Sequence, residues 1–132
     1  MSKRKLPDYR LKQKILYIDK TSPETLARYG DLYLEQDALS DALEFFIKAG
    51  HPAGMEKIKI LALEKGDVFL FQSAAKALQL EISKNEWEDI ARRAADQKKY
   101  SFARYALEKS GNTELLSALA NKMKAEAAEK HS

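Results

Sequence analysis

Residues 23–50 read PETLARYGDLYLEQDALSDALEFFIKAG, and a spacing within this stretch decides the fold. Gly30 and Ala42 lie twelve residues apart, and large apolar residues flank both of them. A small residue on each of two paired helices lets their backbones approach closely. The same separation recurs twice further along the chain, in the pairs Ala62–Ala74 and Ala91–Ala103. The repeated spacing therefore predicts three copies of a helix-turn-helix unit.

The composition is typical of an all-α protein with a single domain. The chain has 132 residues, of which 45% are hydrophobic and 33% are charged, and only 5 glycines and 3 prolines interrupt it. Such a composition favours helix and a folded core. The chain has no apolar run long enough for a membrane span, no apolar secretory stretch near its basic start and no cysteine. We therefore expect a cytoplasmic protein without a membrane partner.

Local signals place the helix ends. Ser22-Pro23-Glu24 supplies a cap, a first-turn proline and an acidic residue, and predicts a helix from 23 to about 36. Ser83 and Glu86 form a capping box, which predicts a helix from 84 to about 97. With the stop signals Gly50, Gly66 and Gly111, further helices are expected near residues 40–49 (opened by Ser40 or Asp41), 53–65, 68–80, 100–109 and 113–130.

The first 22 residues differ from the rest in charge. Residues 1–20 carry a net charge of +5, whereas the remaining residues carry −2. We expect residues 1–22 to form a basic arm and residues 23–130 to form the repeat domain. A short helix over 7–18 would place Leu11, Ile15 and Ile18 on one apolar stripe able to cover the first unit. An extended segment is the alternative, because Tyr17 and Ile18 are good strand formers.

The three units resemble the tetratricopeptide repeat over about two thirds of the chain. That family's pattern is an aromatic residue, Leu-Gly, then Tyr, followed in the second helix by Ala and an aromatic residue. The matching residues of the first unit are Leu26, Tyr29-Gly30, Tyr33, Ala42 and Phe46. Those of the second unit are Ile58, Leu61-Ala62, Ala74 and Leu78, and Lys65 stands where Tyr is usual. Those of the third unit are Trp87, Ile90-Ala91, Ala94, Ala103 and Leu107.

The pattern also departs from the family. The equivalent alanines Ala42, Ala74 and Ala103 are 32 and 29 residues apart, whereas the family period is about 34. We therefore expect irregular stacking. The alternative is a compact helical bundle in which small residues merely reflect close helix packing. In both readings the large apolar residues of the pattern belong to the core.

The resemblance implies a right-handed αα-superhelix of about three helical hairpins with a C-terminal capping helix. It also implies a concave surface, formed by the first helix of each hairpin, that binds a peptide or a helix of a partner protein. Family members that bind a C-terminal carboxylate use Lys and Asn in the first helix, where this chain has Ala27 and Asp31. The partner-binding residues that the resemblance implies are Asp31, Leu34, Lys59, Leu63, Glu88 and Arg92.

No residue pattern indicates catalysis, a metal or a cofactor. His51 and His131 are far apart in the sequence, and no zinc-binding or phosphate-loop motif is present. Serines such as Ser40, Ser83 and Ser110 fall at expected helix ends, where capping accounts for them. We therefore expect a non-enzymatic protein-protein interaction module.

Two other functions stay open from the sequence. The arm could contact nucleic acid, because its basic residues could neutralise phosphates while Tyr9 and Tyr17 stack on bases. A solubilising N-terminus is the simpler explanation of the same residues. The basic residues in question are Lys3, Arg4, Lys5, Arg10, Lys12 and Lys14. The other function is self-association through an unsealed end of the repeat array, so the chain is expected to be a monomer or a weak homodimer.

Overall fold

The fold is taken from a computed structural model, which describes residues 6–130. Within this range the chain contains eight α-helices and no strand, which confirms the all-α prediction. The helices are α1 (Tyr9–Tyr17), α2 (Pro23–Glu35), α3 (Leu39–Ala49), α4 (Pro52–Lys65), α5 (Val68–Ala77), α6 (Lys84–Asp96), α7 (Tyr100–Ser110) and α8 (Thr113–Lys130).

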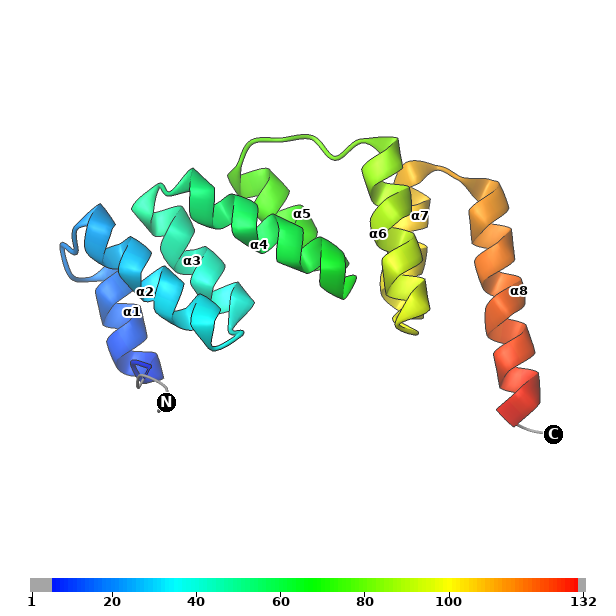
Figure 1. The fold of residues 1–132 in the computed structure, drawn as a ribbon, viewed down its shortest axis with the longest axis horizontal. Coiled ribbons are helices and arrows are strands. Elements are labelled where there is room, and N and C mark those ends of the chain that lie inside the picture. Colours follow the sequence, from blue (N-terminus) through cyan, green and yellow to red (C-terminus); the bar gives the residue numbers. More distant parts are fainter. Residues whose placement is uncertain (1–5, 131–132) are drawn as a thin grey trace.

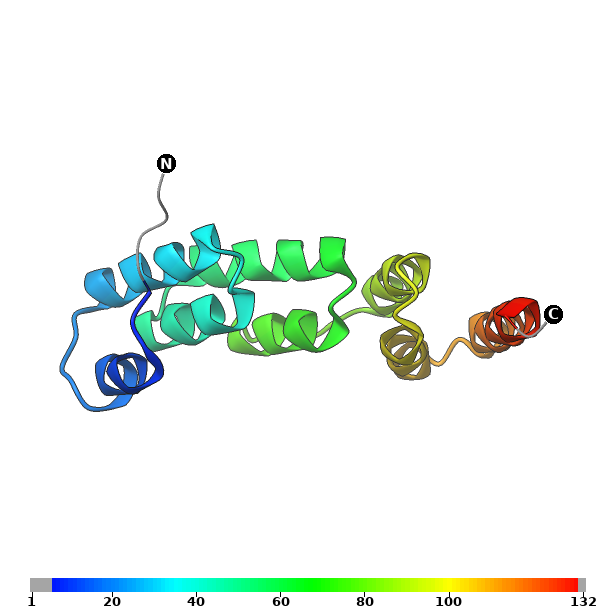
Figure 2. The same cartoon turned by 90° about the horizontal axis from the view of Figure 1, so that it is seen from below.

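Consecutive helices pack in pairs along an elongated molecule (Figure 1). The most extensive contacts join α2 with α3, α4 with α5, and α6 with α7. Neighbouring pairs meet through α3 and α4, α4 and α6, and α5 and α7, and α8 packs on α7. Figure 2 shows the result as two layers, with α2, α4 and α6 in one and α3, α5 and α7 in the other.

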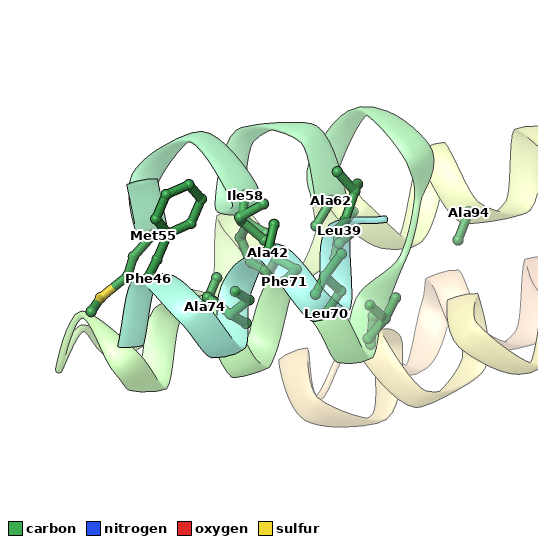
Figure 3. Packing of buried hydrophobic residues seen from close by; sticks show 14 of the residues in the cluster. Leu39, Ala42, Phe46, Met55, Ile58, Ala62, Leu70, Phe71, Ala74 and Ala94 are labelled. Carbon is green, nitrogen blue, oxygen red and sulfur yellow. The ribbon is translucent and has the colours of Figure 1, made fainter. Parts of the chain in front are cut away.

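The small residues of the repeated spacing all lie in the core. Gly30 is buried, and each alanine of the three pairs is 2% exposed or less. Figure 3 shows the core where α3, α4 and α5 meet. The side chains that gather there include Ala42 and Phe46 from α3, Ile58 and Ala62 from α4, and Phe71 and Ala74 from α5. The burial of these positions is consistent with small residues at helix contacts.

Each connection from α2 to α8 contains one residue in the left-handed backbone region. Three are glycines, and three carry side chains, namely Asp37, Gln79 and Lys98. The glycine at 66 is also confined sterically, because a Cβ added there would lie 2.7 Å from the Cα of Ala94 in α6. This close contact joins the end of α4 to α6 and so connects the second pair of helices to the third.

Most predicted caps are present, and one is wrong. The side chain of Ser22 accepts a hydrogen bond from the Thr25 N–H at 3.2 Å, and Ser83 and Glu86 form the predicted capping box. The helix expected to begin at Ser40 or Asp41 instead begins at Leu39 and has no side-chain cap. Leu39 itself is buried in the core.

The short N-terminal helix is present, but the predicted stripe is wrong. Ile15 is buried, whereas Leu11 is 46% and Ile18 is 75% exposed. The buried face of α1 instead contains Leu16 and Lys12. The ammonium of Lys12 donates hydrogen bonds to the carboxylates of Asp41 and Glu44 on α3, so this ion-pair cluster joins the inward face of α1 to α3.

Candidate partner-binding groove

A groove of about 310 Å³ lies between α6 and α8, and α7 contributes to its floor. We call it the α6–α8 groove. The residues that line it are Glu88, Ala91, Arg92, Ala95, Asp96, Leu107, Leu115, Ala118, Leu119 and Lys122. Its floor is apolar, since Ala91, Leu107 and Leu119 are buried core residues. Leu115 on its wall is 41% exposed, so apolar surface is open to a ligand.

The groove exists because α8 is attached at both ends. At the start of α8, Asn112 accepts a hydrogen bond from the Leu115 N–H at 2.9 Å and donates one to Glu88 on α6 at 3.1 Å. Near its end, the Tyr100 hydroxyl of α7 donates to the Glu126 carboxylate. Between these attachments α8 packs on α7, and the groove stays open between α8 and α6.

The bond between Tyr100 and Glu126 changes the acidity of the phenol. The hydrogen bond to the carboxylate, together with burial and the carboxylate's negative charge, raises the pKa of Tyr100 from 10.0 to about 12. The neutral phenol is therefore the form that holds α8 in place at physiological pH.

The rim of the groove carries charges of both signs. The Arg92 guanidinium donates a hydrogen bond of 2.8 Å to the Asp89 carboxylate, one turn earlier on α6. This hydrogen bond outweighs the effect of burial and lowers the pKa of the Asp89 carboxyl. Asp96 and Lys122 are exposed at the same end of the groove. A mixed rim of this kind selects no single ligand charge.

The structure brings two of the six predicted partner-binding residues together. Glu88 and Arg92 both line the α6–α8 groove. Asp31 is exposed on α2, while Leu34 and Leu63 are partly buried and pack against the core. These three residues are not among those that line the groove.

Lys59, the sixth predicted residue, is engaged within the fold. Its ammonium lies 3.2 Å from a Glu86 carboxylate oxygen and 5.4 Å from the ring centroid of Phe71. Burial opposes the charge of Glu86, but the hydrogen bonds from Ser83 and Lys59 outweigh it and lower the pKa of Glu86. Lys59 therefore ties α4 to the capped start of α6.

Sequence reasoning missed the half of the groove that α8 supplies. The sequence predicted this helix only as the C-terminal cap of the repeat domain. In the structure Leu119 is buried and Leu116 partly so, while Leu115 turns toward the groove with Ala118. The spacing of Leu115, Ala118 and Lys122, at i, i+3 and i+7, is the signal that could have indicated a second face.

The described residues show no arrangement for metal chemistry. Across residues 6–130, no group of three or more His, Cys, Asp or Glu side chains could hold a metal ion. His51 precedes α4, and its ring centroid lies 5.6 Å from that of Phe46. His131 lies outside the described residues. In the same range, no helix has both the length and the apolar content to cross a bilayer.

The basic arm is only partly described. Lys12 is 8% exposed and points into the fold. Burial disfavours its charge, but the hydrogen bonds that it donates to Asp41 and Glu44 outweigh burial and raise the pKa of Lys12. Arg10 and Lys14 are exposed, while Lys3, Arg4 and Lys5 lie outside the described residues.

Comparison with known proteins adds no relative. No protein-family model, curated protein sequence or solved structure matches this chain significantly, so the geometry of the α6–α8 groove is the basis for assigning a function.

Proposed function

We propose that this protein is a non-enzymatic protein-protein interaction module that binds a helix or short peptide of a partner in the α6–α8 groove. The observation that carries the proposal is the groove itself, which combines an apolar floor with a polar rim. Its volume of about 310 Å³ is at the lower end of the range typical of ligand-binding pockets.

The dimensions of the groove suit a short helical segment. Its α6 wall runs from Glu88 to Asp96, a rise of about 12 Å, or about two helical turns. A partner helix of that length presents apolar side chains at i, i+3 or i+4, and i+7 to such a groove. Alanines line both walls, at 95 on α6 and at 118 on α8, and let a partner backbone come close.

We further propose that the three pairs of helices are tetratricopeptide-like hairpins stacked as a right-handed superhelix, with α8 as the capping helix. The burial of every small residue in the repeated spacing supports this architecture. The repeated left-handed residue in each connection supports it as well. In this architecture the capping helix also provides one wall of the binding site.

Affinity capture from cross-linked extracts of the source cell, followed by mass spectrometry, tests the proposed function. The wild-type chain serves as bait beside Ala118→Trp, which fills the α6–α8 groove, and Ala128→Trp, which changes an exposed residue near the end of α8. We expect the wild type and Ala128→Trp to enrich the same partner and Ala118→Trp to lose it.

Binding of a synthetic peptide from the enriched partner then gives the affinity directly. We expect Ala118→Trp to weaken binding at least about tenfold, because its indole occupies the site of the partner's apolar side chains. Enrichment of no protein, or equal binding by all three baits, would contradict the proposed function.

A further inference from the structure

The outward face of α1 combines apolar and basic side chains. We define the α1 outer face as Tyr9, Arg10, Leu11, Lys14, Tyr17 and Ile18, all of which are exposed. Tyr9 and Ile18 are each 75% exposed, Tyr17 is 63% exposed and Leu11 is 46% exposed. Large apolar side chains at this level of exposure on one short helix indicate a surface that another molecule or a membrane covers.

The two kinds of side chain lie in adjacent strips. Leu11 and Ile18 are seven residues apart, so they share one side of the helix. Arg10, Lys14 and Tyr17 follow at i, i+4 and i+7 along the neighbouring side. The helix therefore presents an apolar edge beside a basic edge.

The positive charge of this surface is available to a ligand. Arg10, Lys14 and Lys20 are exposed and form no ion pair with any residue in the described range. The ammonium of Lys48 on α3 lies 6.0 Å from the Tyr17 ring centroid and adds a further charge. Of the nearby carboxylates, Asp41 and Glu44 share the single positive charge of Lys12, and Glu44 also accepts a hydrogen bond from the Tyr17 hydroxyl. The others are Asp8, whose side chain caps α1, and Asp19.

We propose that the α1 outer face docks on an anionic lipid bilayer. Arg and Lys would meet lipid phosphates, tyrosines favour the headgroup region, and Leu11 and Ile18 would enter the boundary with the acyl chains. The sequence alone predicted no membrane partner. The outward position of Leu11 and Ile18 changes that expectation.

Charge and apolar content together distinguish this occupant from two others. A second copy of the chain is disfavoured, because two α1 outer faces would bring like charges together. A nucleic acid would satisfy the basic and aromatic residues but would leave Leu11 and Ile18 in water. The face is also independent of the α6–α8 groove, since α1 and α8 lie at opposite ends of the molecule (Figure 1).

Co-sedimentation of the full chain with lipid vesicles tests the proposal. The probes are vesicles of phosphatidylcholine alone and of phosphatidylcholine mixed with an equal amount of phosphatidylserine. We expect binding to the anionic vesicles only, and weaker binding as salt is raised. Leu11→Ser with Ile18→Ser, and separately Arg10→Gln with Lys14→Gln, should each weaken binding at least about tenfold.

Matched substitutions on α4 control for loss of exposed apolar or basic residues in general. Ile60 is 52% exposed and Lys57 is exposed, so Ile60→Ser with Lys57→Gln should leave vesicle binding within about twofold. The proposal fails if the wild type ignores anionic vesicles, or if the α4 variant loses as much binding as the α1 variants. It also fails if the chain prefers single-stranded oligothymidine and Leu11→Ser with Ile18→Ser leaves that preference unchanged, which would assign the face to nucleic acid.

Discussion

At the scale of single residues, Phe46 packs closely against two glycines. Its side chain is fully buried between α2 and α4, where two glycines face the ring. A Cβ added at Gly30 would lie 2.5 Å from the Phe46 Cε1, and one added at Gly54 would also overlap the ring. The ring fits between Gly30 on α2 and Gly54 on α4. A shift away from a methyl group added at one glycine would therefore bring the ring closer to the other.

We therefore expect Gly30→Ala to lower the free energy of unfolding by about 1–3 kcal/mol, although alanine favours helix by about 1 kcal/mol. Urea unfolding measures the effect. In a Phe46→Leu background the smaller side chain relieves the overlap, so Gly30→Ala should cost at least about 0.5 kcal/mol less. Additive effects of the two substitutions would show that the ring and the glycine do not constrain each other.

The left-handed residues of the turns make a second prediction at this scale. Lys98 has a φ of 61°, a region in which glycine is far less strained than other residues. Its N–H bonds to the Ala95 carbonyl at 2.9 Å, a bond that glycine keeps. We expect Lys98→Gly to raise the free energy of unfolding by about 0.5–1 kcal/mol in urea unfolding.

Lys76→Gly is the matched control for this substitution. Lys76 is exposed in the last turn of α5, where glycine costs about 1 kcal/mol relative to a good helix former. Equal destabilisation by both substitutions would mean that the turn at Lys98 stores no backbone strain.

At the scale of elements, the attachment of α8 depends on pH. The hydrogen bond from Tyr100 to Glu126 raises the pKa of the phenol in the folded protein to about 12, above its ordinary value of 10.0. The contact is therefore fully stabilising below pH 10, and its contribution is lost as the pH rises toward about 12.

The ring carbon bearing the Tyr100 hydroxyl reports this ionisation in an NMR titration. We expect Glu126→Gln to return the midpoint from about 12 toward 10.0, and Glu114→Gln, at an exposed position in the first turn of α8, to leave it unchanged. Superimposable curves for the wild type and Glu126→Gln would show that the carboxylate does not hold α8 through Tyr100.

Local signals predicted most helix ends, because caps and glycine stops act within a few residues. The helix from Pro23 begins at the predicted residue, and the capping box at Ser83 opens α6 as expected. The face of α1 was not predictable in the same way. Its inward face includes Lys12, whose partners Asp41 and Glu44 are about thirty residues away in the sequence. A prediction made only from the spacing of apolar residues could not include this ion pair.

At the scale of the whole molecule, the sequence predicted an all-α chain, and the described residues confirm it. The sequence did not predict the α6–α8 groove, because the groove depends on long-range contacts. Asn112 must reach Glu88, and Tyr100 must reach Glu126, before α8 stands beside α6 with a gap between them. Glu88 and Arg92 were predicted through the family resemblance, whereas Leu115 and Ala118 could be placed only by the structure.

If paired helices touch at the repeated small residues, these positions have no room for a larger side chain. Urea unfolding of Ala74→Leu, Ala103→Leu and Ala128→Leu tests it most directly. Ala74 and Ala103 are 0% exposed, so the larger side chain should overpack the contact and lower the free energy of unfolding by about 1–3 kcal/mol. Ala128 is exposed near the end of α8, and the same change there should shift it by no more than about 0.5 kcal/mol. Three variants with indistinguishable stability would contradict helix pairs that touch at these residues.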